Sequence, residues 1–420
     1  MDGNIERVVV TGMGVVSPLG LDVESFWQAL LAGKSGVVEL EGERFENVRP
    51  HIGAIVQDLD ERDFFDRKEM RRLSRSSRLA VVAASQAVGQ AGLQEGGIEL
   101  GEVAVMVGSS IGGYSSSDPY FRDFYEKGRV SPFSIPVSMN SAPSANISIR
   151  FGFRGPLVNI DAACATSAHS IGLASHLIRN GMLEVAVCGG ADDPFSIGVV
   201  AAWNAMKALS QREDNPMEAC RPFSADRDGL VLGEGAGVLV LESESHARLH
   251  GKTILGEISG YGATSDSFHL TQPSKDGPVR AMQRALKDAG LGPGEIDSIN
   301  AHATGTIWND KIETAAIKDV FGARAYDIPV VGNKAALGHS IGASGALEMI
   351  ACLLSLRDQI LPPTINYKVP DPDCDLDYVV TGNRPYVNHH ILSNSFAFGG
   401  SNAALVASLY EPAGSAGHPF

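Results

Sequence analysis

The chain changes character within LVNIDAACATS, residues 157–167, where an apolar run gives way to small residues around Cys164. A segment with apolar residues at helical spacing follows, closed by Asn180 and Gly181. The apolar positions of that segment are Ile171, Ala174, Leu177 and Ile178. This order predicts a strand, a tight turn and a helix, with Cys164 at the turn.

The same order of short β-branched runs, glycine turns and helical stretches recurs along the whole chain. Such alternation favours a sheet covered by helices on both faces, and so an α/β fold. Buried strands that end at glycine are predicted at 7–12, 103–108 and 185–190, and helices at 77–91, 281–289 and 341–356.

One internal boundary is predicted near residues 246–254, where a charged helical end gives way to a strand that starts at Thr253. We therefore expect an N-terminal half over 1–252, a C-terminal half over 253–412 and a frayed tail over 413–420. Each half opens with a strand and a glycine turn, which hints at two similar halves.

Composition excludes several classes of protein. With 44% hydrophobic and 20% charged residues, the 420-residue chain is neither disordered nor fibrous. A net charge of −15 argues against a nucleic-acid binder, although a local basic patch can override the overall sign. No apolar run approaches 18 residues, so we expect no membrane span.

Two features of the sequence indicate where in the cell the protein is found: its cysteines and its first residues. The five cysteines are odd in number and scattered without metal-ligand spacing, so we expect no metal site. The first residues lack the basic and apolar regions of a signal peptide. A reduced, cytoplasmic chain is the simplest expectation.

Cys164 is the candidate nucleophile. Its predicted place near a helix N-terminus, where N–H groups are free and the helix dipole is positive, favours a thiolate. Ala163, Ala165 and Ser167 are small enough to let a substrate approach. A buried structural cysteine is the competing interpretation, and it is the one we give to Cys188, Cys352 and Cys374.

Two segments of the C-terminal half carry groups that handle protons and charge. His302 follows a predicted strand, and Lys334 and His339 flank the glycine turn before the helix at 341–356. A lone histidine is usually structural, but two histidines and a lysine at strand ends favour chemistry. His169 and His176, on the helix after Cys164, are interpreted as structural.

Several motifs in a fixed order identify a family. Besides the segments around Cys164, His302 and Lys334, they are VTGMG (10–14), RPFSADRDG (221–229), GEGAG (233–237) and NSFAFGGSN (394–402). From Val8 to about Leu409, the chain resembles the β-ketoacyl-[acyl carrier protein] synthases, elongating condensing enzymes of the synthase I/II type in the thiolase superfamily. The resemblance implies a thiolase-like fold, in which two similar halves form a layered α-β-α-β-α sandwich.

The resemblance also implies the chemistry. Cys164 would carry an acyl chain as a thioester, and His302 with His339 would stabilise the negative charge that develops when malonyl-carrier protein loses CO2. Lys334 would organise the site with Glu348, fourteen residues later, as its partner. The division of work between the two histidines stays open.

Other roles follow from the same resemblance. The backbone N–H groups of Cys164 and Phe398 would form the oxyanion hole, and Phe398 would also gate the acyl channel. The family usually has glycine between the two phenylalanines, whereas this chain has Ala397, which narrows the backbone freedom of the gate.

The pantetheine and acyl sites depart from the family pattern. Thr304 and Thr306 match threonines that bind the pantetheine arm, although HATGT stands where HGTST is common, and Thr271 is a third candidate. Ile111 and Trp203 match the lining of the acyl channel. Many relatives have phenylalanine at the position of Trp203, so the indole indicates a reshaped or shortened channel, with ordinary core packing as the alternative.

The expected partner is an acidic acyl carrier protein, whose phosphopantetheine arm makes a resident cofactor unnecessary. The residues that match its docking positions are Lys68, Arg71, Arg72, Arg129 and Lys207. We expect a homodimer, with a heterodimer of this chain and a ketosynthase-like subunit as the alternative.

Two other functions fit the sequence less well. A thiolase would carry a second catalytic cysteine near the C-terminus, and NSFAFGGSN has none. A chain-length-setting partner subunit would typically lack the nucleophile, whereas Cys164, His302, Lys334 and His339 are all present. A condensing enzyme of fatty-acid biosynthesis, or of a related polyketide or polyene pathway, is therefore predicted.

Overall fold

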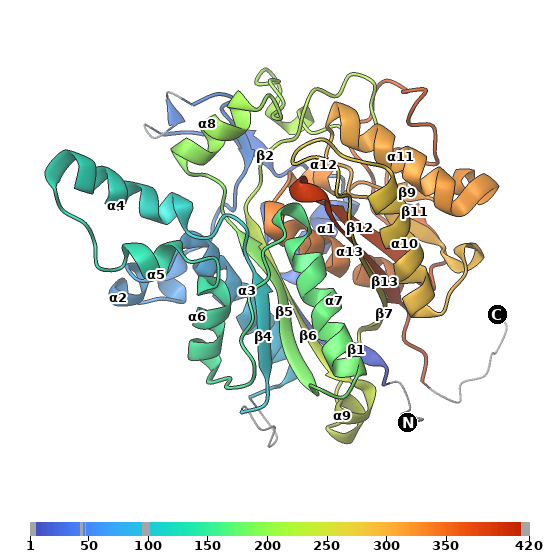
Figure 1. Ribbon diagram of the computed structural model, residues 1–420, viewed down its shortest axis with the longest axis horizontal. Coiled ribbons are helices and arrows are strands. Elements are labelled where there is room, and N and C mark those ends of the chain that lie inside the picture. The colour runs from blue at the N-terminus through green and yellow to red at the C-terminus, as the bar shows by residue number, and fades with distance from the viewer. Residues whose placement is uncertain (1–5, 43–44, 47, 95–100, 413–420) are drawn as a thin grey trace.

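The structure is a computed structural model that describes residues 6–42, 45–46, 48–94 and 101–412 (Figure 1). Within these residues, nine strands are hydrogen-bonded in the order β4-β5-β6-β1-β7-β13-β12-β8-β9. The predicted tail, 413–420, lies outside the described residues.

The N-terminal half supplies the first four strands of this order. Their bounds are β1 (Val8–Val16), β4 (Ala104–Gly108), β5 (Val185–Asp192) and β6 (Gly235–Ser243). β1 pairs antiparallel with β6, β6 antiparallel with β5, and β5 parallel with β4. A small hairpin of β2 (Val37–Glu39) and β3 (Ile52–Ala54) lies apart from them.

The C-terminal half supplies the other five strands. They are β7 (Gly256–Ser265), β8 (Ser298–Asn300), β9 (Val330–Val331), β12 (His390–Phe396) and β13 (Ser401–Ser408). β7 pairs antiparallel with β13, β13 antiparallel with β12, and β12 parallel with β8. This repeats the pairing of β1, β6, β5 and β4, so the expectation of two similar halves is confirmed. Short strands β10 (Ile360–Leu361) and β11 (Arg384–Pro385) pair with each other.

Helices form three layers around the strands. Between the two sets of strands lie α7 (Thr166–Arg179) and α13 (Ser344–Asp358), which pack against β5 and β6 on one side and against β7 and β13 on the other. α3 (Arg75–Ala91) covers the outer face of β1, β5 and β6, and α10 (Asp276–Ala289) covers β7 and β13 (Figure 1). The arrangement is the predicted α-β-α-β-α sandwich.

The remaining helices lie around these layers. They are α1 (Val23–Leu31), α2 (Arg67–Met70), α4 (Tyr114–Lys127), α5 (Ser134–Ser138), α6 (Ala142–Phe151), α8 (Ile197–Ala205), α9 (Glu244–Leu249), α11 (Ile307–Phe321) and α12 (Lys334–Leu337). In Figure 1, α4 extends away from the body of the molecule. Among the described residues, none of the helices has both the length and the apolar character needed to cross a membrane.

The predicted end of the first strand at Gly12 is wrong, because β1 continues through Gly12 and Gly14 to Val16. The glycines serve close packing instead. A Cβ at Gly12 would lie 2.1 Å from the carbonyl oxygen of Ala87, and one at Gly14 would lie 1.9 Å from that of Ala83, both on α3. The strand predicted from Thr253 likewise begins later, at Gly256.

The strand predicted before Cys164 is also wrong. Residues 158–162 belong to no helix or strand, and Leu157 forms a single bridge with Val105 of β4. Val158 N–H donates to the carbonyl of Val105. The apolar run therefore lies along the edge strand β4 without joining the sheet as a full strand.

Candidate active site

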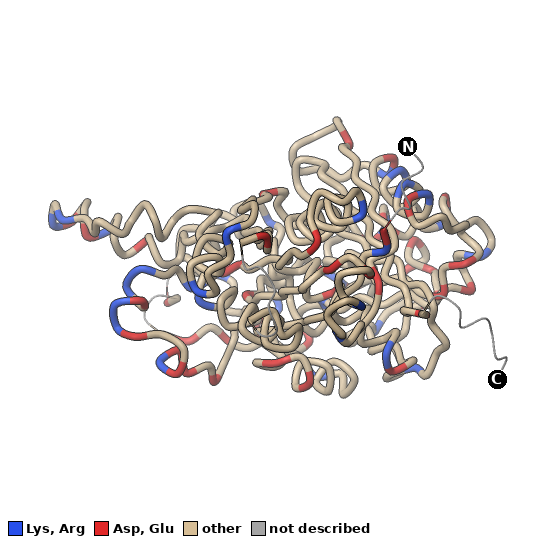
Figure 2. The backbone as a smooth tube through the Cα atoms, turned by 90° about the horizontal axis from the view of Figure 1, so that it is seen from below, with Lys and Arg blue, Asp and Glu red and all other residues tan. Residues whose placement is uncertain are grey.

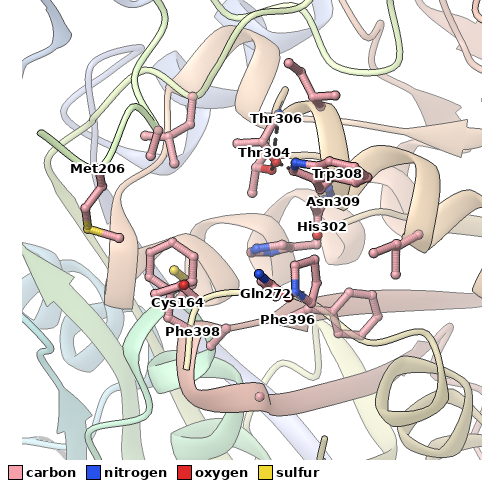
Figure 3. A pocket seen from close by; sticks show the side chains of 18 of the residues that line it. Cys164, Met206, Gln272, His302, Thr304, Thr306, Trp308, Asn309, Phe396 and Phe398 are labelled. Carbon is pink, nitrogen blue, oxygen red and sulfur yellow. Dashed lines mark hydrogen bonds between the residues drawn. The ribbon is translucent and has the colours of Figure 1, made fainter. Parts of the chain in front are cut away.

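A cavity of about 330 Å³ lies between the two halves of the chain. At its inner end are Cys164, His302 and His339, and at its outer end are exposed residues that include Met206 and Trp308 (Figure 3). Segments more than 170 residues apart in sequence thus meet in one space, as the sequence analysis requires.

Cys164 lies in a short 3₁₀ turn, Ala163–Ala165, directly before α7. Ala163 has φ of 46°, a left-handed conformation that is strained for a residue with a Cβ. Two hydrogen bonds hold the turn: Ser110 Oγ donates to the carbonyl of Ala163 at 2.8 Å, and Ala162 N–H donates to Thr166 Oγ1 at 2.8 Å. The turn presents the sulfur to the cavity.

The thiol of Cys164 is neutral in this environment. Burial raises the pKa of Cys164 to about 11, because the anion loses its solvation. The ammonium of Lys334 and the backbone N–H groups of Phe398 and Cys164, which hydrogen-bond to the sulfur, lower the pKa but do not offset burial. The expected free thiolate is therefore not what the structure supports.

Two backbone N–H groups act on the sulfur. Those of Phe398, in the turn between β12 and β13, and of Cys164 itself both lower the pKa of the thiol by hydrogen bonding. Backbone donors beside a nucleophile are what the predicted oxyanion hole requires.

His302 is held by its backbone and by one ring nitrogen. Glu313, buried on α11, accepts hydrogen bonds from the N–H groups of His302 (2.8 Å) and Ala303 (2.9 Å), and so fixes a turn in which Ala303 has φ of 45°. Lys334 Nζ lies 3.3 Å from His302 Nδ1. Because an ammonium only donates, Nδ1 accepts, and the proton of the neutral ring is on Nε2.

His339 has the same tautomer for a different reason. Its Nδ1 accepts a hydrogen bond from Ile341 N–H at 3.2 Å and lies 3.0 Å from Ser344 Oγ, so its ring proton is also on Nε2. The rings of His302 and His339 meet edge to face, with centroids 5.5 Å apart. Burial and the charge of Lys334 hold the pKa of both imidazoles well below the usual value, so both are neutral donors.

Lys334 and Glu348 form a buried ion pair with Nζ and Oε1 2.5 Å apart. Both side chains are 1% exposed. Burial raises the pKa of Glu348, and the ammonium beside it opposes that rise. The predicted pairing of Lys334 with Glu348 is therefore present, and it joins α12 to α13.

The threonines lie towards the outer end of the cavity. Thr304 and Thr306 are within hydrogen-bonding distance of each other, 2.9 Å between their hydroxyl oxygens, and both line the cavity beside Trp308 and Asn309 (Figure 3). Thr271 lines it from the loop before α10. All three predicted pantetheine ligands therefore face one space.

Of the two predicted acyl-channel residues, only Trp203 lines this cavity. Its indole, on α8, stacks on the ring of Phe398 with centroids 5.4 Å apart and planes inclined by 21°. Ile111 packs into the same apolar cluster as Trp203, formed by Phe195, Val200, Leu230, Ile341 and their neighbours, without contributing to the wall of the cavity.

The predicted docking residues come from different segments of the chain. Lys207 lines the cavity, whereas Lys68 is on α2, with Arg71 and Arg72 directly after it. Arg72 lies over the ring of Phe133 at 5.4 Å, and Arg129 follows α4. In Figure 2, Lys and Arg are interspersed with Asp and Glu mainly along the outer loops and helices, and most of the backbone carries neither.

The histidines predicted to be structural are engaged away from the cavity. His169 Nδ1 lies 2.6 Å from Tyr261 Oη and its Nε2 lies 2.9 Å from Ser401 Oγ, while His176 pairs with Asp288. Three buried carboxylates that shape the site are not predicted from the sequence: Asp192, Asp310 and Glu313. The only signal for the last two was their spacing of three residues on the helix after His302.

The sequence also matches family models over most of its length. Residues 5–247 match "Beta-ketoacyl synthase, N-terminal domain", and residues 255–368 match "Beta-ketoacyl synthase, C-terminal domain". The chain belongs to the β-ketoacyl synthase family. As a ketosynthase, it is an acyltransferase of the condensing type.

Individual relatives of this ketosynthase agree with that assignment. Nodulation protein E of Rhizobium meliloti (strain 1021) is 41% identical over 401 residues, which cover 95% of this chain and 98% of the relative. The 3-oxoacyl-[acyl-carrier-protein] synthase 2 of a Synechocystis species is 39% identical over 410 residues, 97% of this chain and 99% of the relative. The solved ishigamide ketosynthase/chain length factor superposes with a TM-score of 0.91 at 35% identity, over 97% of this chain and 100% of that one.

Proposed function

We propose that this ketosynthase joins an acyl chain, held as a thioester on Cys164, to the two-carbon unit left when malonyl-acyl carrier protein loses CO2. The observation that carries the proposal is the meeting of Cys164 with the two neutral imidazoles of His302 and His339 in one cavity. Thiol nucleophile, paired N–H donors and an oxyanion hole are the parts that such a reaction needs.

In the first step, the sulfur of Cys164 attacks the acyl thioester carbonyl. The negative charge on the carbonyl oxygen is met by the N–H groups of Cys164 and Phe398. The carrier thiol leaves and takes up the proton that Cys164 has lost, so the acyl chain stays on Cys164 with no net change of charge.

In the second step, loss of CO2 from the malonyl group leaves an enolate, whose oxygen accepts from Nε2–H of His302 and His339. Each such donor in a water-poor site is worth about 3–4 kcal/mol to the transition state. The enolate carbon then attacks the acyl carbonyl, the C–S bond to Cys164 breaks, and the thiolate regains a proton. Lys334 keeps Nδ1 of His302 unprotonated, so that Nε2 holds the donor proton.

Acyl carrier protein is the proposed partner, and its phosphopantetheine arm would lie along Thr304, Thr306 and Thr271. No resident cofactor is required for this sequence of steps. The basic residues Lys68, Arg71, Arg72, Arg129 and Lys207 would meet the acidic carrier, with electrostatic steering of a brief encounter.

We further propose that the enzyme is a homodimer and works in the cytoplasm. Exposed apolar side chains on α4, α5, α6 and the 157–158 segment support the first proposal. The five cysteines, all unpaired and buried, support the second.

Cys164→Gln tests the division of roles. An amide in place of the thiol cannot carry an acyl chain but resembles an acylated cysteine. We expect condensation to fall to background, while decarboxylation of malonyl-carrier protein continues or increases. Loss of decarboxylation in a variant with an unchanged melting temperature would show that the roles are not separable as proposed.

The alternative, a chain-length-setting subunit of a ketosynthase heterodimer, is distinguished by labelling. The active-site inhibitor cerulenin, followed by peptide mapping, should modify Cys164 and spare Cys188, Cys220, Cys352 and Cys374. An inert Cys164 in the folded chain would favour the subunit function.

A further inference from the structure

The carboxylate of Asp192 lies at the end of β5, fully buried, and the proposed chemistry gives it no part. Its Oδ1 accepts from Ser109 Oγ at 2.5 Å and from Ile111 N–H at 2.9 Å, and its Oδ2 accepts from Gly342 N–H at 2.8 Å. Ser110 N–H lies within 3.2 Å of both oxygens. One side chain thus joins the loop after β4 to the turn before α13.

The contact of Asp192 with Ser110 leads to the nucleophile. Ser110 donates its hydroxyl to the carbonyl of Ala163 at 2.8 Å and lies 2.7 Å from Thr166 Oγ1. Ala163 has the strained φ of 46° and precedes Cys164. Such a conformation persists only where its surroundings fix it, and the link from Asp192 through Ser110 does so.

The contact of Asp192 with Gly342 leads to His339. Gly342 follows Ile341, which has φ of 46° and whose N–H donates to His339 Nδ1. A Cβ at Gly342 would lie 2.6 Å from Asp192 Oδ2, so only glycine allows the carboxylate to approach. The same carboxylate therefore holds the turn that sets the tautomer of His339.

Asp192 also acts on the sulfur through its charge. The four donors are neutral, and a buried anion among neutral donors keeps most of its field. That charge raises the pKa of Cys164, whereas Lys334 lowers it. Burial raises the pKa of Asp192 itself to about 6, so the carboxylate is ionised above that pH.

We propose that Asp192 is a positioning residue that sets Cys164 against His339 by holding both strained turns, and whose charge opposes that of Lys334 at the sulfur. The inference rests on the proposed function for its catalytic meaning, but the geometry and the charge can be tested on the thiol alone.

The test is alkylation of Cys164 by iodoacetamide between pH 7 and 9, quantified by peptide mapping, together with condensation measured in the same preparations. The other groups that face the sulfur, Lys334, His302 and His339, stay unchanged in Asp192→Asn. Loss of the negative charge that raises the thiol pKa lowers that pKa. Alkylation should therefore be several-fold faster at each pH, with the gain in thiolate partly offset by its lower nucleophilicity. Condensation should be roughly 10- to 100-fold slower, since an amide N–H facing a backbone donor displaces a turn.

Glu242→Gln is the matched control. Glu242 is a fully buried carboxylate on β6 whose register partner, Val185, stands at the opposite end of β5 from Asp192. It should leave both the alkylation profile and condensation unchanged. An equal acceleration of alkylation in this control would assign the effect to general loosening of the fold and overturn the proposal.

Ser110→Ala separates geometry from charge. It removes the hydroxyl link to Ala163 and keeps the charge of Asp192, so condensation should slow while the alkylation rates stay at the wild-type values. The proposal is overturned if Asp192→Asn alkylates at the wild-type rate, or if both variants condense normally. Labelling that spreads to the other four cysteines would identify an unfolded Asp192→Asn, and Ser110→Ala would then decide the geometry. Failure of the proposed function would look different, as wild-type protein that alkylates normally and does not condense.

Discussion

At Cys164, two influences of opposite sign meet, and their magnitudes decide the charge of the sulfur. A helix N-terminus stabilises a nearby anion by about 0.3–1 kcal/mol, rising to ~2 in favourable buried positions. The pKa rise from 9.0 to about 11 corresponds to roughly 2.7 kcal/mol against the anion. Burial therefore wins, and the thiolate forms only as the thioester carbonyl arrives to receive its electrons.

The stack of Trp203 on Phe398 predicts the acyl preference at the scale of single residues. We propose that an acyl chain enters behind Phe398, as the predicted gate requires, moves that ring and so breaks the stack. Trp203→Ala should therefore raise kcat/KM for long acyl donors relative to short ones, by roughly 10- to 100-fold.

The measurement is a series of acyl-carrier proteins from four to sixteen carbons. Trp308→Phe, a change at the outer end of the cavity, is the control and should scale all donors equally. If the chain-length preference is unchanged in Trp203→Ala, Trp203 has only a packing function.

At the scale of elements, the contact of α7 with β7 and β13 depends on one neutral imidazole. Burial lowers the pKa of His169 to about 4, below the 6.5 of an unfolded histidine. The folded state thus binds the proton less tightly than the unfolded state, and the stability from the neutral form is lost as pH falls from 6.5 towards 4.

His169→Gln keeps hydrogen-bonding groups for Tyr261 and Ser401 and cannot titrate. Over that pH range, the free energy of unfolding of the wild type should fall relative to this variant by about 3 kcal/mol. Urea unfolding at pH 7.5, 6, 5 and 4 measures the difference. A constant difference across these pH values would contradict the assignment of His169 as a buried neutral group.

The basic residues directly after α2 are predicted to dock the acidic carrier protein. Reversal of two charges, Arg71→Glu with Arg72→Glu, should lower kcat/KM for carrier-borne substrates roughly tenfold, because steering of the acidic partner is lost. A small thioester that needs no docking should react at the wild-type rate.

Arg284→Glu with Lys287→Glu, on the exposed face of α10, is the control of equal charge change. If kcat/KM falls equally for both substrates, Arg71 and Arg72 contribute to folding and not to carrier docking.

At the scale of the whole molecule, apolar surface is concentrated on one side of the N-terminal half. The large exposed apolar residues there are Phe121, Phe124, Tyr125, Val130, Ile135, Met139, Ile149, Leu157 and Val158. The exposed Leu157 and Val158 also lie along β4, the first strand in the sheet order, and a contiguous exposed apolar patch marks an interaction surface. Both features favour a dimer.

Val158→Glu should shift the protein from the proposed dimer to monomer in sedimentation velocity, because it would put a charge into the proposed apolar interface. Leu249→Glu on α9 makes the same chemical change at an exposed apolar residue away from this surface, and should have no effect. If the chain alone is a monomer at micromolar concentration, the homodimer is wrong, and the heterodimer with a ketosynthase-like subunit takes its place.

The sequence by itself determined the fold class and the residues that carry chemistry, because short-range pattern and ordered motifs mark strands, turns and reactive groups locally. Strand–helix alternation predicted a sheet covered by helices on both faces, and the family resemblance implied the five layers. Cys164, His302, Lys334 and His339 were identified by their places at turns. The resemblance added Glu348, fourteen residues from its partner, and the structure places it there.

Only the tertiary structure decided the states of those groups and the residues that hold them. Protonation of Cys164 depends on burial, which is a property of the assembled halves, and the tautomers of His302 and His339 depend on Lys334 and on the N–H of Ile341. Asp192 and the stack of Trp203 on Phe398 join segments far apart in sequence, so no local pattern marks them. Gly12 shows the same limit, since its role in the close packing of α3 depends on a helix more than sixty residues away.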